Sequence, residues 1–402
     1  MGKIAVLGTL DTKGIEHQFV ADAITRKGHE AILIDVGGLA PPVVEPDFSR
    51  DEVAAAGGVN LAVLVEQQDR GALVGAMSQA AAEFLKKLYH KDSIQGVISL
   101  GGSGGTAIAT AAMRALPLGF PKVMVSTMAS GDVQGYVGEK DIVMIPSIVD
   151  VAGLNRFSRL IFTRAVGVIC GMIESEIVES EERPIIVASM FGNTTECIDS
   201  AKIALEKEGY EVLVFHATGT GGRTMESLIE SGMVSGVLDV TTTEWADELV
   251  GGVLAAGPRR LEAAARTGVP SVVSLGCLDM VNFGSPNSIP ERFSQRRFYH
   301  HNPQVTLMRT SVEESRELGR VIAEKLNLSV GPVTVLIPLR GLSVIGAVGE
   351  AFADPDADQA LFQTLRENLR DDIGVLEIDT PVNDPSFSSA CVTALLENIK
   401  RV

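Results

Sequence analysis

The feature that most constrains this fold is an internal repeat of a strand, a turn, a helix and a second strand. The segment IAVLGTLDTKGIEHQFVADAITRKGHEAILIDVG begins at Ile4 and aligns without a gap with IIVASMFGNTTECIDSAKIALEKEGYEVLVFHAT, which begins at Ile185. In this alignment Gly28 falls on Gly209. Self-similarity at a fixed spacing indicates two halves that fold in the same way.

Two further pairs of segments repeat in the same order. GFPKVMVSTMASGDV from Gly119 resembles GVPSVVSLGCLDMV from Gly268, and DIVMIPSIVDVAGLNRFSRLI resembles QVTLMRTSVEESRELGRVI. A chain of 402 residues also exceeds the length of one ordinary core. We therefore predict two domains, residues 1–181 and 182–402, joined near the acidic segment ESEIVESEERP at residues 174–184.

Each half alternates short runs of Val, Ile and Leu with helical patterns. Continuous apolar strands indicate sheets that are buried on both faces, hence parallel strands joined by crossover helices. The predicted fold class is α/β, with two tandem Rossmann-like, doubly wound parallel-sheet domains related by internal duplication. The second domain carries a C-terminal extension, which begins at the strand VTVLIP and ends in a helix near residues 389–400.

Composition excludes several classes of function. The formal net charge is −17 and no basic run occurs, which argues against nucleic-acid binding. No apolar stretch is long enough to span a bilayer, so we expect a cytoplasmic protein without a membrane partner. The four cysteines are widely spaced and form no CxxC pair, which indicates a reducing compartment and no metal site.

The most informative motif is GGSGGT at residues 101–106, which follows the apolar run GVISL and opens a helical pattern. Glycines let a ligand approach the backbone closely, and free amides at a helix start attract an anion. The motif is neither a Walker loop nor GxGxxG, and a tight strand-to-helix turn is the alternative interpretation. In the second half, GVLDV is followed by TTTEWADE, which has no glycine and carries Glu244 and Asp247. We therefore expect a phosphate or carboxylate site in the first half alone.

Three other segments of the first half could contribute to this site. In GTLDTKG, Thr12 and Lys13 could contact a terminal phosphate, while Asp11 could hold Mg²⁺ or cap the helix. Asp35 ends a strand where an acidic residue often binds ribose hydroxyls. The long loop 126–141 could close over a ligand or simply follow the surface. The expected cofactor-binding residues are Gly8, Thr9, Asp11, Thr12, Lys13, Asp35, Gly101, Gly102, Ser103, Gly104, Gly105, Thr106, Gly131 and Asp132.

In the second half, RRFYHHNPQVTLMRTS at residues 296–311 gathers cationic and imidazole side chains in an otherwise acidic chain. It could bind an acidic substrate or supply a general base, and a structural hydrogen-bonded cluster is the alternative. Adjacent histidines point in different directions, so no metal site is expected. The catalytic candidates are His300, His301 and Arg309, and the substrate-binding candidates are Asn193, Thr194, Gly221, Gly222, Arg223, Arg340 and Ser343.

Five stretches carry a family resemblance over nearly the whole chain: GTLDTKG, SLGGSGGT, YVGEKDIVMIPSIVDVAGLNR, HNPQVTLMRTS and GLSVIGAVGEAFADPDAD. The chain resembles the family formed by the N-terminal domain of the plant tomato mosaic virus resistance protein and its bacterial homologues. The resemblance implies two Rossmann-like subdomains, self-association, and ATP binding at residues 101–106 and the first loop. In the plant protein it also implies inhibition of a viral replication protein. The resemblance further implies Asp at the position of Gly346, where this chain departs.

The expected function is that of a cytoplasmic ATP-binding protein that forms a homo-oligomer, a dimer or larger. We expect an enzyme that uses ATP, with or without Mg²⁺, on a small acid or sugar acid in a cleft between the two halves. The alternative is a non-enzymatic nucleotide sensor or interaction module. An NAD-linked oxidoreductase is disfavoured because GxGxxG is missing after the first strand.

Overall fold

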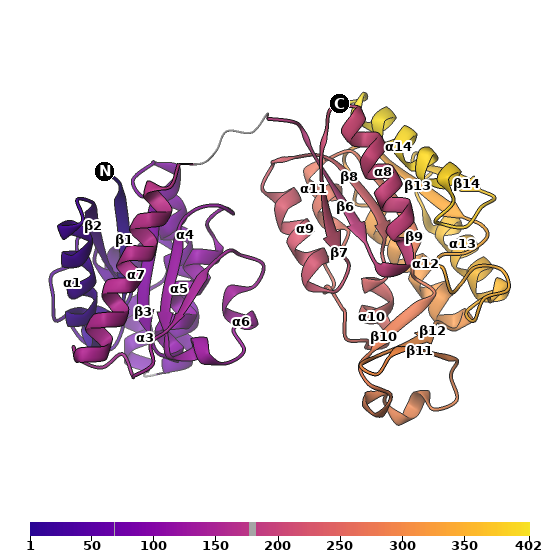
Figure 1. Ribbon diagram of the computed structural model, residues 1–402. Helices are drawn as coiled ribbons and strands as arrows, with labels where there is room; N and C mark the ends of the chain where they lie inside the picture. Colours follow the sequence, from indigo (N-terminus) through magenta and orange to yellow (C-terminus); the bar gives the residue numbers. More distant parts are fainter. Residues whose placement is uncertain (68, 177–181) are drawn as a thin grey trace. The chain divides into compact units, whose positions relative to one another are not determined.

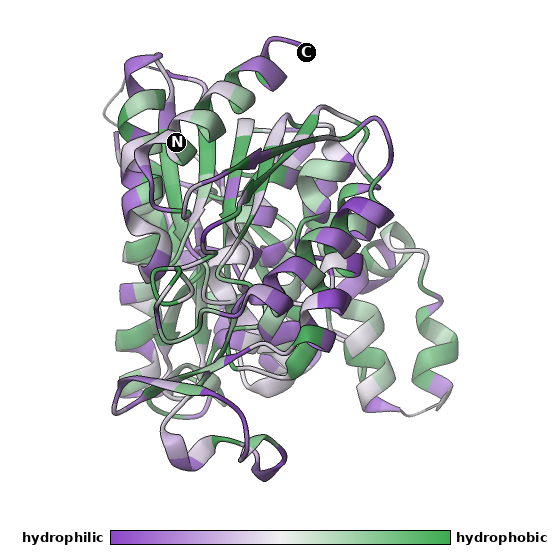
Figure 2. Cartoon of the chain, turned by 90° about the vertical axis from the view of Figure 1, so that its right-hand side faces the viewer, coloured by the Kyte–Doolittle hydropathy of each residue, from purple (hydrophilic) through white to green (hydrophobic). Residues whose placement is uncertain are grey.

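The computed structural model describes residues 1–67, 69–176 and 182–402. The chain forms two compact units, Met1–Glu179 and Ser180–Val402, called the N-terminal and the C-terminal unit (Figure 1). The predicted junction at residues 174–184 lies partly outside the described residues. Figure 2 shows that the strands of the sheets are mostly hydrophobic, as expected for sheets covered on both faces.

The N-terminal unit is built on a five-stranded parallel sheet with the order β2-β1-β3-β4-β5. The strands are β1 (Lys3–Gly8), β2 (Glu30–Asp35), β3 (Gly96–Gly101), β4 (Lys122–Ser126) and β5 (Val143–Pro146). Every residue of β3 is buried, which explains its unbroken apolar sequence. The strand order reverses between β1 and β3, and this is the place where open α/β sheets form a ligand crevice.

Helices cover both faces of this sheet. They are α1 (Leu10–Arg26), α2 (Arg50–Ala56), α3 (Leu61–Gln67), α4 (Arg70–His90), α5 (Ser103–Arg114), the short α6 (Gln134–Val137) and α7 (Arg156–Glu174). Ala5 and Leu7 of β1 belong to the core formed with α4 and α5, whereas Ile4 and Val6 belong to the core formed with α1 and α7. Successive side chains of a strand point to opposite faces, so one apolar strand supplies both cores.

The C-terminal unit has a six-stranded parallel sheet with the order β14-β13-β9-β8-β6-β7. The strands are β6 (Ile185–Met190), β7 (Glu211–His216), β8 (Val234–Thr241), β9 (Ser271–Gly276), β13 (Val333–Pro338) and β14 (Gly374–Ile378). Read from β7, the first five strands repeat the order found in the N-terminal unit, and β14 is added at the edge. The predicted fold class, two Rossmann-like units related by duplication, is confirmed.

One of the three aligned segment pairs occupies different places in the two units. The segment aligned with β5 forms β12 (Val305–Arg309), which pairs antiparallel with β10 (Met280–Phe283) and β11 (Phe298–Asn302) in a separate small sheet. The position equivalent to β5 is taken by β13. Both segments combine an apolar strand with a capped helix, and the sequence pattern alone does not distinguish which sheet the strand joins.

The helices of the C-terminal unit also form two layers. They are α8 (Thr195–Lys207), α9 (Thr220–Glu230), α10 (Glu244–Val250), α11 (Glu262–Thr267), α12 (Val312–Leu326), α13 (Pro355–Asn368) and α14 (Pro385–Ile399). Residues of α8 and α14 form one core with the sheet, and residues of α10, α12 and α13 form the other. The predicted extension is present as β13, α13, β14 and α14.

Two sequence expectations concern the chain as a whole. The four cysteines are free and buried, as is typical of cysteines that pack as small hydrophobic residues. Within the parts of the chain that the structure describes, no helix combines the length and apolarity that a bilayer crossing requires.

Candidate functional site

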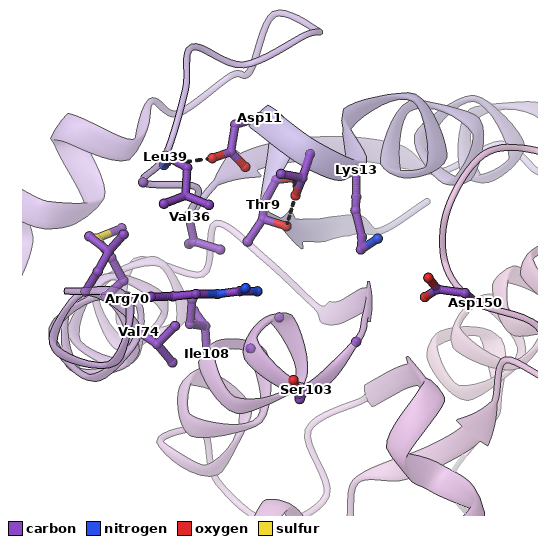
Figure 3. Close-up of a pocket in the computed structure, with 17 residues that line it drawn as sticks. Thr9, Asp11, Lys13, Val36, Leu39, Arg70, Val74, Ser103, Ile108 and Asp150 are labelled. Carbon is purple, nitrogen blue, oxygen red and sulfur yellow. Dashed lines mark hydrogen bonds between the residues drawn. The ribbon is translucent and has the colours of Figure 1, made fainter. Parts of the chain in front are cut away.

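A cavity of about 240 Å³ lies in the N-terminal unit, where the first loop and the glycine-rich loop converge (Figure 3). The loops follow β1 and β3, the neighbouring strands at which the strand order reverses. Of the expected cofactor-binding residues, the wall contains Thr9, Asp11, Thr12, Lys13, Gly102, Ser103, Gly104 and Gly105. It also contains residues that the sequence did not suggest: Val36, Gly38, Leu39, Arg70, Leu73, Val74, Met77, Ile108 and Asp150.

The start of α5 presents free backbone donors. The amide of Thr106 donates to the carbonyl of Gly102 at 2.8 Å and closes the first helical turn. No side chain caps this end of the helix, and the described residues offer no acceptor to the amides of Ser103, Gly104 and Gly105. Such amides carry the partial positive charge of a helix N-terminus and can bind an anion.

The contacts around the glycines favour a ligand site over a merely tight turn. A Cβ on Gly101 would lie 3.1 Å from the Cα of Gly105, so packing restricts that position. A Cβ on Gly102, Gly104 or Gly105 would meet nothing closer than 3.7 Å, and none of these three has a positive φ. Most of the glycines are therefore not required by packing, and they leave the amides of α5 open to the cavity.

Arg70 adds a cationic side chain that sequence reasoning missed. It is the first residue of α4, and Figure 3 shows its guanidinium extending across the cavity. Its Nη2 lies 3.9 Å from the position of a Cβ on Gly104, and no acceptor for the guanidinium occurs among the described residues. A cation at the first position of a helix is disfavoured by the helix dipole. That unfavourable placement, next to the N-cap Asp69, is the signal that could have identified Arg70.

Lys13 lies where α1 is interrupted. Its φ of −132° and ψ of 24° are not helical, and its Nζ donates to the carbonyl of Val151. The carbonyl of Lys13 accepts from Nδ1 of His17 at 2.7 Å, while Nε2 of His17 accepts from the amide of Leu100 at 3.4 Å. Burial lowers the pKa of His17, which agrees with a neutral ring in this bridging role. His17 thus links the two loops that form the cavity.

Asp11 ties the first loop to the chain after β2. Its Oδ2 accepts from the amides of Leu39 at 2.9 Å and Ala40 at 3.3 Å. Thr9, not Asp11, occupies the N-cap position of α1. The other oxygen, Oδ1, is buried and has no hydrogen-bond partner in the described chain. Asp11 therefore belongs to the cavity wall, while its carboxylate holds the chain after β2, with Oδ1 buried next to Gly37.

Asp35 does not line the cavity, which differs from the expected ribose contact. Its side chain is fully buried, and Oδ1 accepts from the amides of Leu10 at 3.0 Å and Gly37 at 2.8 Å. Burial raises the pKa of this carboxyl. Asp35 fixes the loops after β1 and β2, so its contribution to the cavity is structural.

The remaining expected residues of the N-terminal unit also lie outside the wall. Oγ1 of buried Thr106 is 2.7 Å from Oγ of Ser126. Gly131 and Asp132 are exposed, and Oδ1 of Asp132 accepts from the amide of Gln134 within the same loop. Gly8 and Gly101 end β1 and β3, one strand residue before the loops that form the wall.

A second cavity, of about 580 Å³, lies in the C-terminal unit. Its wall combines residues that follow β6 and β7 with residues of the small antiparallel sheet. The lining residues are Phe191, Gly192, Asn193, His216, Thr218, Leu254, Asn282, Tyr299, His301, Asn302, Val305, Leu307, Val344 and Ile345. Among the predicted residues of this half, His301 and Asn193 lie in this wall, whereas His300, Arg309, Thr194, Gly221, Gly222, Arg223, Arg340 and Ser343 do not.

The turn TGTGGRT at residues 218–224, which contains the substrate-binding candidates Gly221, Gly222 and Arg223, binds a carboxylate of the protein. Oε1 of Glu244 accepts from the amides of Gly219 at 2.6 Å and Gly222 at 3.1 Å, and its Oε2 accepts from Nε of Arg260 at 2.7 Å. Arg223 donates to the carbonyl of Ala255 at 3.2 Å. An added anion would have to displace Glu244, which is fully buried.

The arginines of residues 296–311 are held in structural pairs. Arg309 is only 3% exposed, and it donates from Nε to the carbonyl of Phe352 at 2.8 Å and from Nη2 to Asp358 at 2.6 Å. Arg296 pairs with Glu314, and Arg297 lies 3.5 Å from a carboxylate oxygen of Asp354. These contacts agree with the alternative of a structural cluster and leave Arg309 away from the cavity. His300 is exposed on β11.

The other substrate-binding candidates serve local structure. Arg340 pairs with Asp379 at 2.7 Å on the surface, and Oγ1 of Thr194 is 2.8 Å from Oγ1 of Thr241.

Ser343 donates from Oγ to Oδ2 of the buried Asp279 at 2.6 Å. A Cβ on Gly346 would lie 2.0 Å from that same oxygen. Glycine at 346 therefore fits the close approach of the loop to Asp279.

The fold and the first cavity define a protein of two Rossmann-like units, with a cavity at the strand-order reversal of the first. The chain belongs to the uncharacterised protein family UPF0261. The model of that family's N-terminal domain matches residues 2–177, and the model of its C-terminal domain matches residues 183–399.

Related proteins occur in bacteria and in tomato. A UPF0261 protein of Clostridium tetani is 50% identical over 99% of both chains, and one of Rhizobium meliloti is 48% identical over 98% of both. The tomato (Solanum lycopersicum) ToMV resistance protein Tm-1(GCR237) is 44% identical over 82% of this chain, which corresponds to 45% of the tomato protein. The family resemblance seen in the sequence is thereby confirmed.

Matches to solved structures are weak. A UDP-N-acetylglucosamine 2-epimerase from Rickettsia bellii matches with a TM-score of 0.24 and 13% identity over 67% of this chain and 78% of the epimerase. Another UDP-N-acetylglucosamine 2-epimerase matches with a TM-score of 0.24 and 10% identity over 90% of both chains. These scores carry no inference about activity.

Proposed function

We propose that the cavity of the N-terminal unit binds the phosphate groups of a nucleotide, ATP. One observation supports this proposal above all others: Ser103, Gly104 and Gly105 line the same cavity as Arg70. Among the described residues, neither the amides of these three residues nor the guanidinium of Arg70 has a hydrogen-bond partner. Backbone amides and an arginine fork are the donors that bind phosphate oxygens most directly. Together they supply positive potential in a chain whose net charge is −17.

The donors are too many and too widely distributed for a single small anion. Thr9, Thr12 and Lys13 line the side of the cavity formed by the first loop, and the Lys13 ammonium also donates to the carbonyl of Val151. The amides of α5 line another side. A chain of phosphates would contact both sets of donors at once, whereas one carboxylate would contact only one.

Apolar side chains next to these donors provide room for a base. Leu39, Leu73 and Val74 line the cavity beside Arg70. A neighbouring hollow of about 290 Å³ shares Leu39, Arg70 and Leu73 with it and extends to Leu64 and Val65. Polar donors at one end and apolar surface at the other are what a nucleotide requires.

Two carboxylates could take part in holding Mg²⁺ with the phosphates. Asp11 and Asp150 both line the cavity, and Figure 3 shows Asp150 on the side of Lys13. Magnesium typically binds one or two carboxylates together with substrate phosphates and waters. The ion would neutralise phosphate charge, and the protein residues would fix its position.

The structure gives less support to use of ATP on a small acid or sugar acid. That expectation depended on free cations in residues 296–311, and Arg296, Arg297 and Arg309 are all paired with carboxylates. We therefore propose nucleotide binding and assign no acid substrate to that segment.

Calorimetric titration of ATP, with and without Mg²⁺, into the full chain tests the proposal. In Gly104→Asp the new side chain fits sterically, but its charge would pair with Arg70 and repel phosphate. We expect ATP affinity to fall by at least tenfold. Gly171→Asp is the matched control, because it adds the same charge at an open glycine of α7 outside the cavity wall. Absence of ATP binding, or equal affinity in both variants, would reject the proposal.

A further inference from the structure

The cavity of the C-terminal unit is a second candidate site, and the nucleotide proposal makes no use of it. Its volume of about 580 Å³ falls in the range of small-molecule pockets. Phe191 and Asn193 come from the loop after β6, and His216 ends β7. The cavity thus lies at the carboxyl ends of parallel strands, where ligands of open α/β sheets bind.

The chemistry of the wall argues against a strongly charged ligand. Its polar groups are amides, a hydroxyl, a phenol and imidazoles, and the described residues that line it include no Asp, Glu, Lys or Arg. The rest of the wall is apolar, with Phe191, Leu254, Val305, Leu307 and Ile345 among its members. An ionised ligand would lose hydration here without gaining an ionic partner, which is unfavourable. The wall suits a neutral, largely apolar molecule.

Asn282 indicates which polar group such a molecule would need, namely a hydrogen-bond donor. It lines the cavity and is only 1% exposed. Its backbone amide donates to Oδ1 of Asp247 at 2.6 Å, and its Nδ2 donates to Oδ2 of Asp247 at 2.9 Å. Asp247 therefore fixes the side-chain NH₂ toward itself, and Oδ1 of Asn282 remains as an acceptor. This oxygen is buried and has no hydrogen-bond partner in the described residues.

A buried acceptor without a partner costs free energy that a ligand donor can recover. The ligand would place an N–H or O–H group at Oδ1 of Asn282. Flat side chains line the same cavity: the rings of Phe191 and His216 lie 5.4 Å apart at an interplanar angle of 31°. Rings in such an arrangement provide surface on which a planar ligand can stack.

We propose that the C-terminal unit binds a neutral, planar, largely apolar organic molecule whose N–H or O–H group donates to Asn282. An aromatic amide has this chemistry. The matching aromatic carboxylate lacks both the donor and the neutral charge. This assignment differs from the small acid expected from the sequence, and it holds whether or not the N-terminal unit binds ATP.

The test compares 2-naphthamide with 2-naphthoate on the full chain at pH 7.5, by saturation-transfer NMR and titration. The two probes share the ring system and differ in charge and in the donor. We expect 2-naphthamide to bind at least tenfold more tightly than 2-naphthoate. Equal binding of the two probes, stronger binding of 2-naphthoate, or no binding of 2-naphthamide at millimolar concentration would overturn the proposal.

Two variants locate the bound probe. Leu254→Trp would place an indole ring in the cavity and narrow it, and we expect it to abolish 2-naphthamide binding. Leu249→Trp is the matched control, because Leu249 is exposed and lies outside the wall. Asn282→Ala removes the acceptor and should weaken binding roughly tenfold. Binding that survives Leu254→Trp, or that is lost equally in Leu249→Trp, would contradict the site. The Leu254→Trp result stands even if Asn282→Ala fails to fold.

Discussion

The carboxylate of Asp247 accepts two hydrogen bonds from Asn282, one from the backbone amide at 2.6 Å and one from Nδ2 at 2.9 Å. Asp247 is fully buried in α10, and burial raises its pKa to about 7, with the charge of Glu244 acting in the same direction. Asp247 therefore orients the side chain of Asn282 in the wall of the second cavity, and its own carboxyl titrates near neutral pH.

This raised pKa predicts a pH-dependent stability of the C-terminal unit. Between the ordinary value of 3.8 and about 7, the folded state binds a proton that the unfolded state has released. The free energy of unfolding should therefore fall as pH rises through this window, by roughly 2 kcal/mol from pH 5.5 to 7. Urea unfolding followed by the fluorescence of Trp245, the single tryptophan, measures it. In Asp247→Asn the free energy of unfolding should depend less steeply on pH. An unchanged pH dependence would assign the titration to another group.

A buried ion network predicts a large difference between two neighbouring arginines. Arg260 is 2% exposed and donates to both oxygens of Asp239, at 2.5 and 2.7 Å, and to Glu244 and Glu226. Arg260→Met would leave the buried carboxylates of Asp239 and Glu244, and the partly buried one of Glu226, without their cation. We expect a loss of about 3–5 kcal/mol in the free energy of unfolding.

The adjacent Arg259 provides the control for this prediction. Its side chain is 69% exposed, and it forms a 3.3 Å surface pair with Glu230. Arg259→Met should change stability by no more than about 1 kcal/mol. Urea titration followed by Trp245 fluorescence compares the free energies of unfolding of the two variants. Similar losses of stability in both would contradict a special contribution of the buried network.

The contact between Gly8 and His17 predicts that the N-terminal unit tolerates no side chain at the end of β1. A Cβ on Gly8 would lie 2.2 Å from Nε2 of His17, which is fully buried. We expect Gly8→Ala to cost about 1–3 kcal/mol by overpacking. Gly167→Ala in α7 meets no atom within 4 Å and should be neutral or stabilising. Hydrogen exchange of peptides from β1 and β3 should accelerate in Gly8→Ala only, and acceleration in neither variant would contradict the prediction.

The sequence predicted those features that depend on patterns along the chain. The repeat beginning at Ile4 and Ile185 predicted two parallel-sheet domains that fold in the same way, and loops after neighbouring parallel strands lie at the same edge of a sheet. Contacts between distant elements could not be predicted in this way. Arg70 reaches the first cavity from α4, and Glu244 occupies the amides of α9. Both depend on tertiary packing, for which the sequence carries no local signal of comparable strength.

Arg70 provides the sharpest test of how the first cavity would recognise a nucleotide. Its guanidinium faces the amides of α5 and has no carboxylate partner among the described residues. Arg70→Ala should therefore weaken ATP binding by about ten- to a hundredfold, the range expected for the loss of a charge-assisted contact with phosphate. Binding of adenosine, which has no phosphate, should be unchanged. Arg164→Ala, an exposed arginine of α7 outside the wall, is the control. Calorimetry of both ligands with both variants tests whether Arg70 contacts phosphate. An equal loss of ATP and adenosine affinity in Arg70→Ala would mean that Arg70 shapes the cavity without contacting phosphate.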